Sequence, residues 1–208
     1  ETGVIDAEEL AGLRKDMSQD EYNQEYECCP DAAIQGSYYT KELSRANEQG
    51  RICNVPLEIN YPVDTYWDLG VGHSTAIWFV QCIGNEIRVI DCYENDGSGL
   101  DHYIKMLDDK RTKLRYNYGK HTGPHDLSVR ELGTGKTRLE SARSLGIEFD
   151  IAPKLSREDG INAVQILLEK CWFDKTKCEP GLNALRNYRR VYNDKRKAYS
   201  DEPYDDWS

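Results

Sequence analysis

Runs of apolar, aromatic and β-branched residues recur three times in the middle of the chain, at residues 63–69, 75–83 and 86–94. Runs of this length and composition predict β-strands. Short connections such as Gly84-Asn85 separate them, and such connections favour antiparallel hairpins. The pattern therefore predicts three consecutive strands of one sheet.

Helical spacing of apolar residues replaces this pattern further along the chain. Leu100 and Leu107, with two apolar residues between them at helical spacing, predict a helix over residues 100–110. Thr137 and Glu140 have the spacing of a capping box at the start of another helix. Helices are expected over residues 5–28, 40–50, 137–146, 156–172 and 180–197, with a short strand over residues 147–152.

The predicted element order is βββαβαβα, which builds a mixed sheet with helices on both faces. This order resembles that of the ribonuclease H-like fold, in which a carboxylate on the first strand and another at the end of the fourth converge at one edge. Residues 1–60 are expected to form an acidic helical lead-in, and residues 61–208 the α/β domain itself.

Composition places the chain among soluble globular proteins, because 38% of its 208 residues are hydrophobic and 31% are charged. No apolar run approaches the roughly 20 residues that a membrane span needs. Seven cysteines without a CxxC pair indicate reduced thiols in a reducing cytosol, with a zinc site as the weaker alternative.

The net charge of −10 is unevenly distributed along the sequence. Residues 1–64 hold 14 acidic and 5 basic residues, whereas residues 105–143 hold 10 basic and 5 acidic ones. Basic patches on an acidic chain favour a phosphate-lined partner bound from one side. Solvated helix faces explain a single patch equally well. The basic residues expected to contact nucleic acid are Lys110, Arg111, Lys113, Lys120, Lys136 and Arg138.

Two aspartates are the main candidates for chemistry. Asp68 ends the first predicted strand, where a carboxylate is costly unless something pairs with it. Asp126 follows Pro124-His125, where a fourth strand of the sheet would finish. If these strands are neighbours, the two carboxylates repel each other unless a cation neutralises them, and Mg²⁺ or Mn²⁺ prefers such oxygen ligands. The chemistry expected from that arrangement is two-metal phosphodiester hydrolysis. For either aspartate alone, a turn or helix cap is the alternative.

Other polar residues near the strand ends are weaker candidates. Asp91, in the third predicted strand, could approach the metal ions or serve as a polar edge residue. His73 and Ser74 lie in the turn after the first strand, where a turn role is the default and contact with water or phosphate is the alternative.

The segment Gly133-Thr134-Gly135-Lys136-Thr137 invites comparison with a nucleotide phosphate loop. That motif needs a glycine five positions before its Gly-Lys pair, and Arg130 stands there. The segment is therefore expected to be a loop that opens a capped helix near a nucleic-acid backbone, and no ATP turnover is expected.

Several motifs, taken in order, resemble those of one protein family. They are the runs Pro62–Gly70, Ile90–Glu94, Pro124–Asp126 and Arg130–Arg138, which look like nuclease motifs of the large terminase subunits of tailed bacteriophages. Members of this family carry an N-terminal packaging ATPase and a C-terminal ribonuclease H-like nuclease. The chain resembles the second part, with a piece of the junction before it.

This resemblance implies an endonuclease domain that cuts double-stranded concatemeric DNA with little sequence preference. It implies that Asp68 and Asp126 are the first and second metal-binding acids, with two Mg²⁺ or Mn²⁺ ions in the complete site. The partners it implies are double-stranded DNA, the ATPase domain of the full-length chain, the portal protein and the small terminase subunit, in the host cytoplasm and without a membrane.

The chain departs from the family pattern at its end. The tail Pro203–Ser208 resembles the stretch just before a Ser-His-x-x-Asp-Ala element that carries the third metal-binding acid, which is therefore expected after Ser208. Asp205 and Asp206 are candidates for a partial substitute. Two alternatives stay open: another ribonuclease H-like nuclease, such as a resolvase or an RNA–DNA hybrid nuclease, and a non-catalytic module that docks on portal and DNA.

Overall fold

A computed structural model describes residues 36–70, 74–130, 135–193 and 198–204 of the chain. The helices expected over residues 5–28 lie outside these residues, as do His73, Asp205 and Asp206. The chain divides into two compact units, of which one holds Ala46–Leu182 and the other includes Asn183–Asp206. The division expected at residues 60 and 61 therefore falls inside the larger unit.

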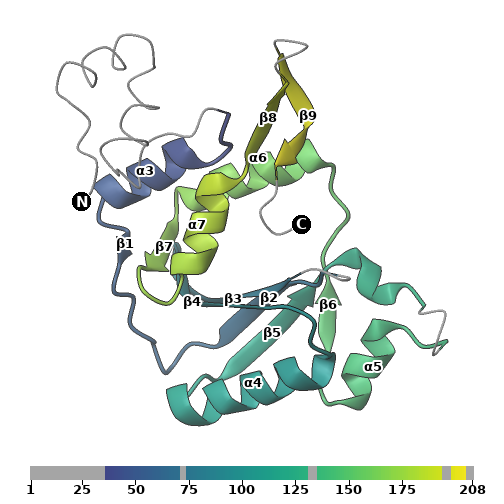
Figure 1. Cartoon of the computed structure of the whole chain (residues 1–208). Helices are drawn as coiled ribbons and strands as arrows, with labels where there is room; N and C mark the ends of the chain where they lie inside the picture. The colour runs from purple at the N-terminus through teal and green to yellow at the C-terminus, as the bar shows by residue number, and fades with distance from the viewer. Residues whose placement is uncertain (1–35, 71–73, 131–134, 194–197, 205–208) are drawn as a thin grey trace, which may run out of the picture. The chain divides into compact units, whose positions relative to one another are not determined.

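A seven-stranded mixed sheet forms the centre of the larger unit, with strand order β1-β7-β4-β3-β2-β5-β6 (Figure 1). Only β3 runs antiparallel to its neighbours, β2 and β4, and the other pairs are parallel. The predicted mixed sheet is thus confirmed. Its strands are β1 (Ile52–Cys53), β2 (Val63–Asp68), β3 (Thr75–Ile83), β4 (Glu86–Asn95), β5 (Tyr118–Gly123), β6 (Phe149–Ile151) and β7 (Cys171–Asp174).

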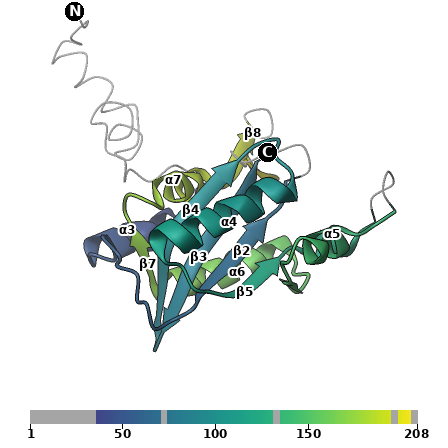
Figure 2. The ribbon, with the colours of Figure 1, turned by 90° about the horizontal axis from the view of Figure 1, so that it is seen from below.

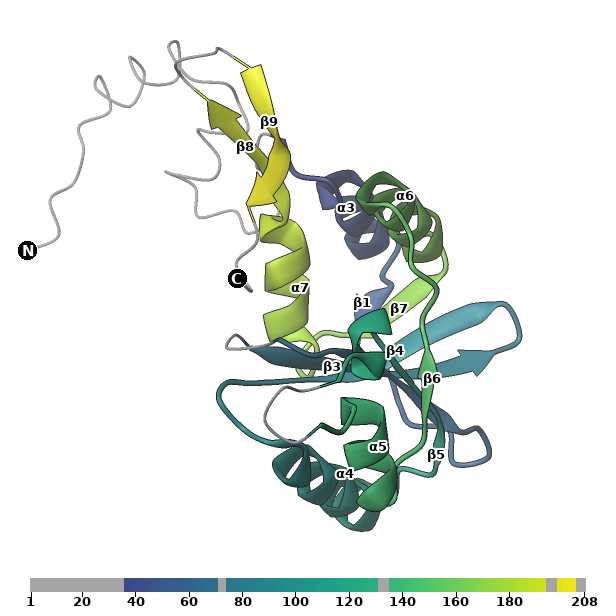
Figure 3. The same cartoon turned by 90° about the vertical axis from the view of Figure 1, so that its right-hand side faces the viewer.

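Helices cover both faces of this sheet. On one face lie α4 (Leu100–Leu114) and α5 (Arg138–Ser144), and on the other lie α6 (Arg157–Leu168) and the start of α7 (Glu179–Asn187) (Figures 1 and 3). Viewed from below, α4 lies across β4, β3 and β2 (Figure 2). The helices expected over residues 100–110 and 137–146 are confirmed as α4 and α5. The Thr137–Glu140 capping box at the start of α5 is also present.

The main core lies between the sheet and α4. Alternate residues of β2 are buried, and Trp67 packs edge-on against Tyr103 of α4 and Phe149 of β6. Ile77 and Phe79 of β3 are fully buried in the same cluster. The buried side chains of β2 therefore face α4, and Asp64, Tyr66 and Asp68 project from the opposite face.

Two helices are shorter than the sequence predicts, and strands take their place. The helix expected over residues 156–172 ends at Leu168, and Cys171–Asp174 forms β7, which pairs in parallel with β4 and β1. Its aromatic residues suit a half-buried strand better than a helix end.

The last predicted helix, over residues 180–197, ends at Asn187. It is followed by an antiparallel pair, β8 (Arg189–Asn193) and β9 (Ala198–Tyr204), where β-branched and aromatic residues favour strands.

The smaller unit has an aromatic cluster of its own. Tyr39 stacks on Tyr188 with ring centres 5.7 Å apart, and the Ser37 hydroxyl donates to the Arg186 carbonyl at 3.2 Å. Helix α3 (Thr40–Glu48) begins in this unit, and Gly50 follows it with φ of +70°, the left-handed conformation that ends many helices. The helix expected over residues 40–50 is confirmed. None of the helices in the described ranges has the length and apolar character of a membrane span.

Candidate metal-binding site

Parallel pairing of β2 and β5 brings Asp68 and Asp126 to one edge of the sheet. Tyr66 of β2 is level with Thr122 of β5, so the carboxyl ends of both strands meet at this edge. Asp68 is the last residue of β2, and Asp126 lies in a short 3-10 helix, His125–Ser128, directly after β5. Neighbouring strands lie about 4.8 Å apart. The pairing confirms that the strands before the two acids are neighbours, with Asp68 at the end of β2 and Asp126 three residues after the end of β5.

The Asp126 carboxylate has an unsatisfied oxygen. Its Oδ1 is buried and has no hydrogen-bond partner among the described residues. A buried carboxylate oxygen without a partner is costly, and a bound cation is the usual way to satisfy it. Asp68, on the neighbouring strand, has an exposed side chain that a cation or its water ligands can reach. The donor set is all oxygen, which fits Mg²⁺ or Mn²⁺.

Two carboxylates alone do not complete a metal site. Within the described ranges, no group of three or more His, Cys, Asp or Glu residues could hold a metal ion. The further candidates Asp205 and Asp206, and the turn residue His73, lie outside those ranges. The assignment of Asp68 and Asp126 as metal ligands stays a prediction.

Asp91 is engaged elsewhere, so its expected approach to the metal ions is wrong for this structure. It opposes Phe79 and so faces α4, whereas Asp68 opposes Ala76 and projects from the other face. Only 4% of Asp91 is exposed, and its carboxylate forms an ion pair with Lys110 and accepts a hydrogen bond from Tyr116 Oη at 3.1 Å. This network is a structural element of the core.

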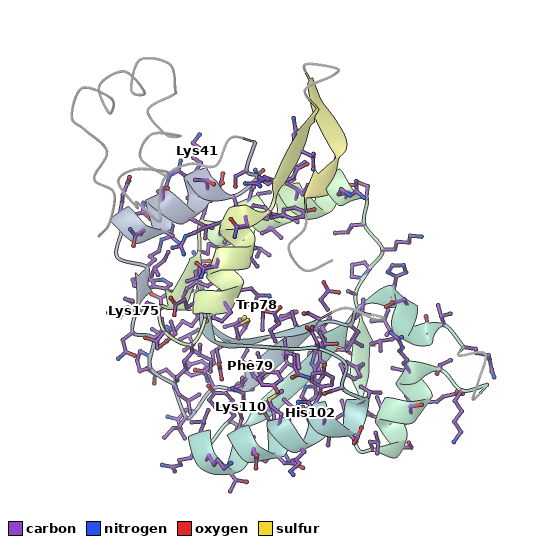
Figure 4. The ribbon with its side chains drawn as sticks, in the orientation of Figure 1. Lys41, Trp78, Phe79, His102, Lys110 and Lys175 are labelled. Carbon is purple, nitrogen blue, oxygen red and sulfur yellow. The ribbon has the colours of Figure 1, made fainter. Side chains whose placement is uncertain are left out.

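Lys110 is therefore not available for DNA, contrary to expectation. It reaches from α4 toward β3 (Figure 4), and its Nζ lies 5.0 Å from the centre of the Phe79 ring. The buried position of the ion pair makes it a fixed link between α4 and β4.

The remaining basic residues do not form one surface. Lys136 and Arg138 lie at the start of α5, which packs against the 3-10 helix that carries Asp126. Helix α4 starts at the edge of the acids and is 15 residues long, so Arg111 and Lys113 lie about 15–20 Å from that edge. Lys120 lies within β5, three residues before the carboxyl end of that strand, and its Nζ lies 3.9 Å from the Asp150 carboxylate. Among the basic candidates, Lys136 and Arg138 are therefore those next to the element that packs against the Asp126 helix.

A buried hydrogen-bond chain links β2 to β5 below the acids. Trp67 Nε1 donates to Thr65 Oγ1 at 2.7 Å, and Thr65 Oγ1 lies 2.6 Å from Nδ1 of His121 on β5. Because an indole can only donate, the Thr65 hydroxyl is free to donate its own hydrogen to a neutral His121 ring. The chain fixes the register of the two strands that carry the acids. The sequence analysis did not single out Thr65 or His121, although a threonine among the buried positions of a strand is a signal for such a contact.

His121 makes this link sensitive to pH. Burial lowers the pKa of His121 below its ordinary value of 6.5, and the charge of Arg111 lowers it further, against an opposing effect of Asp64. The rings of Tyr118 and Phe149 also face it. Below about pH 6.5 the unfolded chain binds more protons than the folded one, so the free energy of unfolding falls as the pH falls.

Replacing His121 by asparagine, which keeps an acceptor but cannot titrate, is expected to flatten this pH dependence. The melting temperature of the wild type should fall more steeply between about pH 7 and 5 than that of the variant. The exposed His125→Asn is the matched control. Parallel curves for the wild type and His121→Asn would mean that His121 does not set the pH dependence.

Comparisons with known proteins identify the fold. No protein-family model and no curated protein sequence matches the chain. Several solved structures resemble it, among them the following three. The large terminase of the thermophilic bacteriophage D6E in complex with ADP matches with a TM-score of 0.58 and 14% identity, over 94% of this chain and 48% of that chain. The nuclease domain of the P22 large terminase matches with a TM-score of 0.53 and 18% identity, over 74% of this chain and 80% of that chain. The large terminase nuclease of thermophilic phage G20c with bound cobalt matches with a TM-score of 0.52 and 16% identity, over 82% of this chain and 89% of that chain.

The chain therefore has the ribonuclease H-like α/β fold of the large terminase nuclease domains, which confirms the fold that the motifs predicted. At identities of 14 to 18%, these likenesses concern the fold. The chain spans less than half of the D6E large terminase, 48% of its length, but most of the isolated nuclease domains. It corresponds in extent to the nuclease part of such a protein.

Proposed function

We propose that the chain is the metal-dependent endonuclease domain of a viral DNA-packaging terminase. The observation that carries this proposal is the buried, unpartnered Oδ1 of Asp126, next to the strand end that holds Asp68. The fold shared with large terminase nucleases supports the same conclusion, because one of them, from phage G20c, has been solved both with bound cobalt and with bound magnesium.

In this proposal Asp68 and Asp126 hold divalent cations, Mg²⁺ or Mn²⁺, at the carboxyl ends of β2 and β5. Bound there, two such ions would activate an attacking water and stabilise the leaving oxygen of a phosphodiester. The protein fixes the two carboxylates through the parallel register of the strands and the Thr65–His121 contact. Asp205, Asp206 or residues after Ser208 would add the further acid that the described residues lack.

The proposed substrate is double-stranded concatemeric DNA, cut with little sequence preference. Lys136 and Arg138 are proposed to contact its backbone near the acids, because phosphate contacts position DNA without reading its sequence. The proposed partners are the ATPase domain of a longer chain, the portal protein and the small terminase subunit, in the cytoplasm of the host. These follow from the resemblance to whole terminases.

A plasmid assay tests this function. The chain is incubated with supercoiled plasmid and with an RNA–DNA hybrid, in Mn²⁺, in Mg²⁺ and in EDTA, and its melting temperature is measured in the same buffers. We expect nicking of the plasmid in either metal, none in EDTA, and a higher melting temperature with metal because a ligand that binds the folded state stabilises it.

Two other outcomes would contradict the proposal. Cleavage of the hybrid with the plasmid intact would favour a hybrid nuclease. DNA binding without cleavage and without any stabilisation by metal would favour a docking module. The described residues hold no group of three metal ligands, which is consistent with that alternative.

A further inference from the structure

The strand motif Ile90–Glu94, which has no role in the proposed function, ends in an acid at the same sheet edge as Asp68. β3 runs antiparallel to both β2 and β4, so the carboxyl ends of β2 and β4 lie together. Glu94 is the last residue but one of β4. The motif therefore brings a further carboxylate to this edge, and it belongs to the larger unit like Asp68 and Asp126.

Strand register places Glu94 and Asp68 in one row across the sheet. Asp68 pairs with Ala76 of β3, and Ala76 pairs with Glu94 on its other side. Side chains of directly paired residues point to the same face, so Glu94 and Asp68 share the face opposite α4. Asp91, three residues earlier, faces α4. The two acids of the motif therefore have separate places.

The row lies next to the part of this face that α7 covers. Trp78, two residues after Ala76 on β3, packs its ring on Gly181 of α7, where a Cβ would not fit (Figure 4). In the row itself, Asp68 and Glu94 are both exposed. Ala76 between them has only a methyl group, so no larger side chain separates the two carboxylates.

The Glu94 carboxylate is also available for a ligand. Asp91 is held by Lys110, whereas Glu94 forms no ion pair or hydrogen bond with another described residue. β5 pairs with β2 on the side away from β3, so Asp126 and Glu94 flank Asp68 from opposite sides. Three carboxylates gathered in this way repel one another unless a cation lies among them.

The width of the row suits a hydrated cation. Neighbouring strands lie about 4.8 Å apart, so the backbones that carry Asp68 and Glu94 are separated by roughly 10 Å. This separation agrees with the finding that no three acids of the described residues form one ligand group. Mg²⁺ usually keeps several water ligands when one or two carboxylates bind it. A carboxylate at the distance of Glu94 can therefore reach such a cation through one of these waters.

We propose that Glu94 is a positioning residue of the metal site, and that its carboxylate holds the hydration shell of a divalent cation bound at Asp68. This role rests on the proposed function, which supplies the cation. Partners in the outer shell of a metal orient its ligands and strengthen its binding. Glu94 would thus contribute to metal affinity without being a direct ligand.

Binding of Mn²⁺ to Glu94→Gln tests this role without any cleavage. The free ion is measured by electron paramagnetic resonance, which gives the dissociation constant. We expect this constant to rise about tenfold or more, the usual effect of losing an outer-shell contact. In EDTA the variant should melt at the same temperature as the wild type or higher, because one of several like charges is gone. A purely structural residue would lower that melting temperature instead.

Two further variants separate a specific contact from a general effect of charge. Glu94→Asp keeps the charge but shortens the side chain by one methylene, so it should lose most of the same affinity. Glu86→Gln is the matched control at the other end of β4, where the Glu86 carboxylate is paired with Arg88 at 2.8 Å. This variant should bind Mn²⁺ like the wild type.

Three results would overturn the role of Glu94 and leave the metal site itself intact. One is wild-type Mn²⁺ affinity in Glu94→Gln when Asp68→Asn has lost binding. Another is an equal loss in Glu94→Gln and Glu86→Gln, which would indicate a diffuse charge effect. The third is wild-type affinity in Glu94→Asp, because the charge alone would then suffice. Mn²⁺ binding that survives Asp68→Asn would instead contradict the proposed function, and this role with it.

Discussion

Asp126→Asn is expected to abolish metal-dependent cleavage of DNA while the protein remains folded. The substitution keeps the shape of the side chain and removes the charge that would bind a cation. Loss of a ligand of this kind should lower the rate by about 100-fold or more. Because Oδ1 is buried without a partner in the absence of metal, the variant should unfold at the same denaturant concentration as the wild type or a higher one.

The decisive measurement is the combination of nicking rate and metal-induced stabilisation. Asp126→Asn and Asp68→Asn should both lose nicking and the rise in melting temperature with Mn²⁺. Asp150→Asn, on β6 and with an exposed side chain, is the matched control and should keep both. Retained nicking in either Asp68→Asn or Asp126→Asn would remove that residue from the site.

Asp91→Asn is expected to be the most destabilising single substitution of a polar residue described here. It leaves Lys110 in a largely buried position without its counter-charge, with side-chain exposures of 6% for Asp91 and 17% for Lys110. Breaking a buried ion pair from one side costs about 3–5 kcal/mol. Tyr116 would also lose the acceptor of its hydroxyl.

Urea unfolding of three variants separates this effect from a general loss of charge. Asp108 forms an ion pair with Arg111 on the same helix, but both side chains are exposed, at 61% and 57%. Asp108→Asn should therefore cost about 0.5 kcal/mol or less. The double variant Asp91→Leu with Lys110→Met should recover most of the lost stability, since no charge is then left buried. Equal effects of Asp91→Asn and Asp108→Asn would show that the Lys110 pair is not important for stability.

The central strands and the helices α4 and α5 could be predicted because local signals agree with tertiary packing. The run Val63–Asp68 is β-prone and alternates in burial, and Thr137 with Glu140 forms the expected capping box. Strand β7 could not be predicted, because its four residues gain their stability from pairing with β4 and β1, which are distant in sequence. The hairpin at the end of the chain was missed for the same reason.

One part of the candidate site could also be predicted from the sequence, and another part could not. The placement of Asp68 and Asp126 at one edge of the sheet follows from the parallel pairing of β2 and β5, which the sequence pattern gives indirectly. The face to which a side chain points depends on strand register. In the β3–β4 pair, a bulge between Phe79 and Val80 shifts the register. No local signal revealed this, so the position of Asp91 on the α4 face, and its capture of Lys110, could not be predicted.

Without the contact between Thr65 and His121, β2 and β5 could pair in a wrong register. Side chains alternate along strands, so a slip of one residue between β2 and β5 would turn one acid away from the other. A chain with such a slip could keep its helices and most of its apolar packing, and a spectroscopic measure of secondary structure would not detect the change. Inactive preparations would then look native, and the defect would be found only by measuring which amide protons of β2 and β5 are protected from exchange.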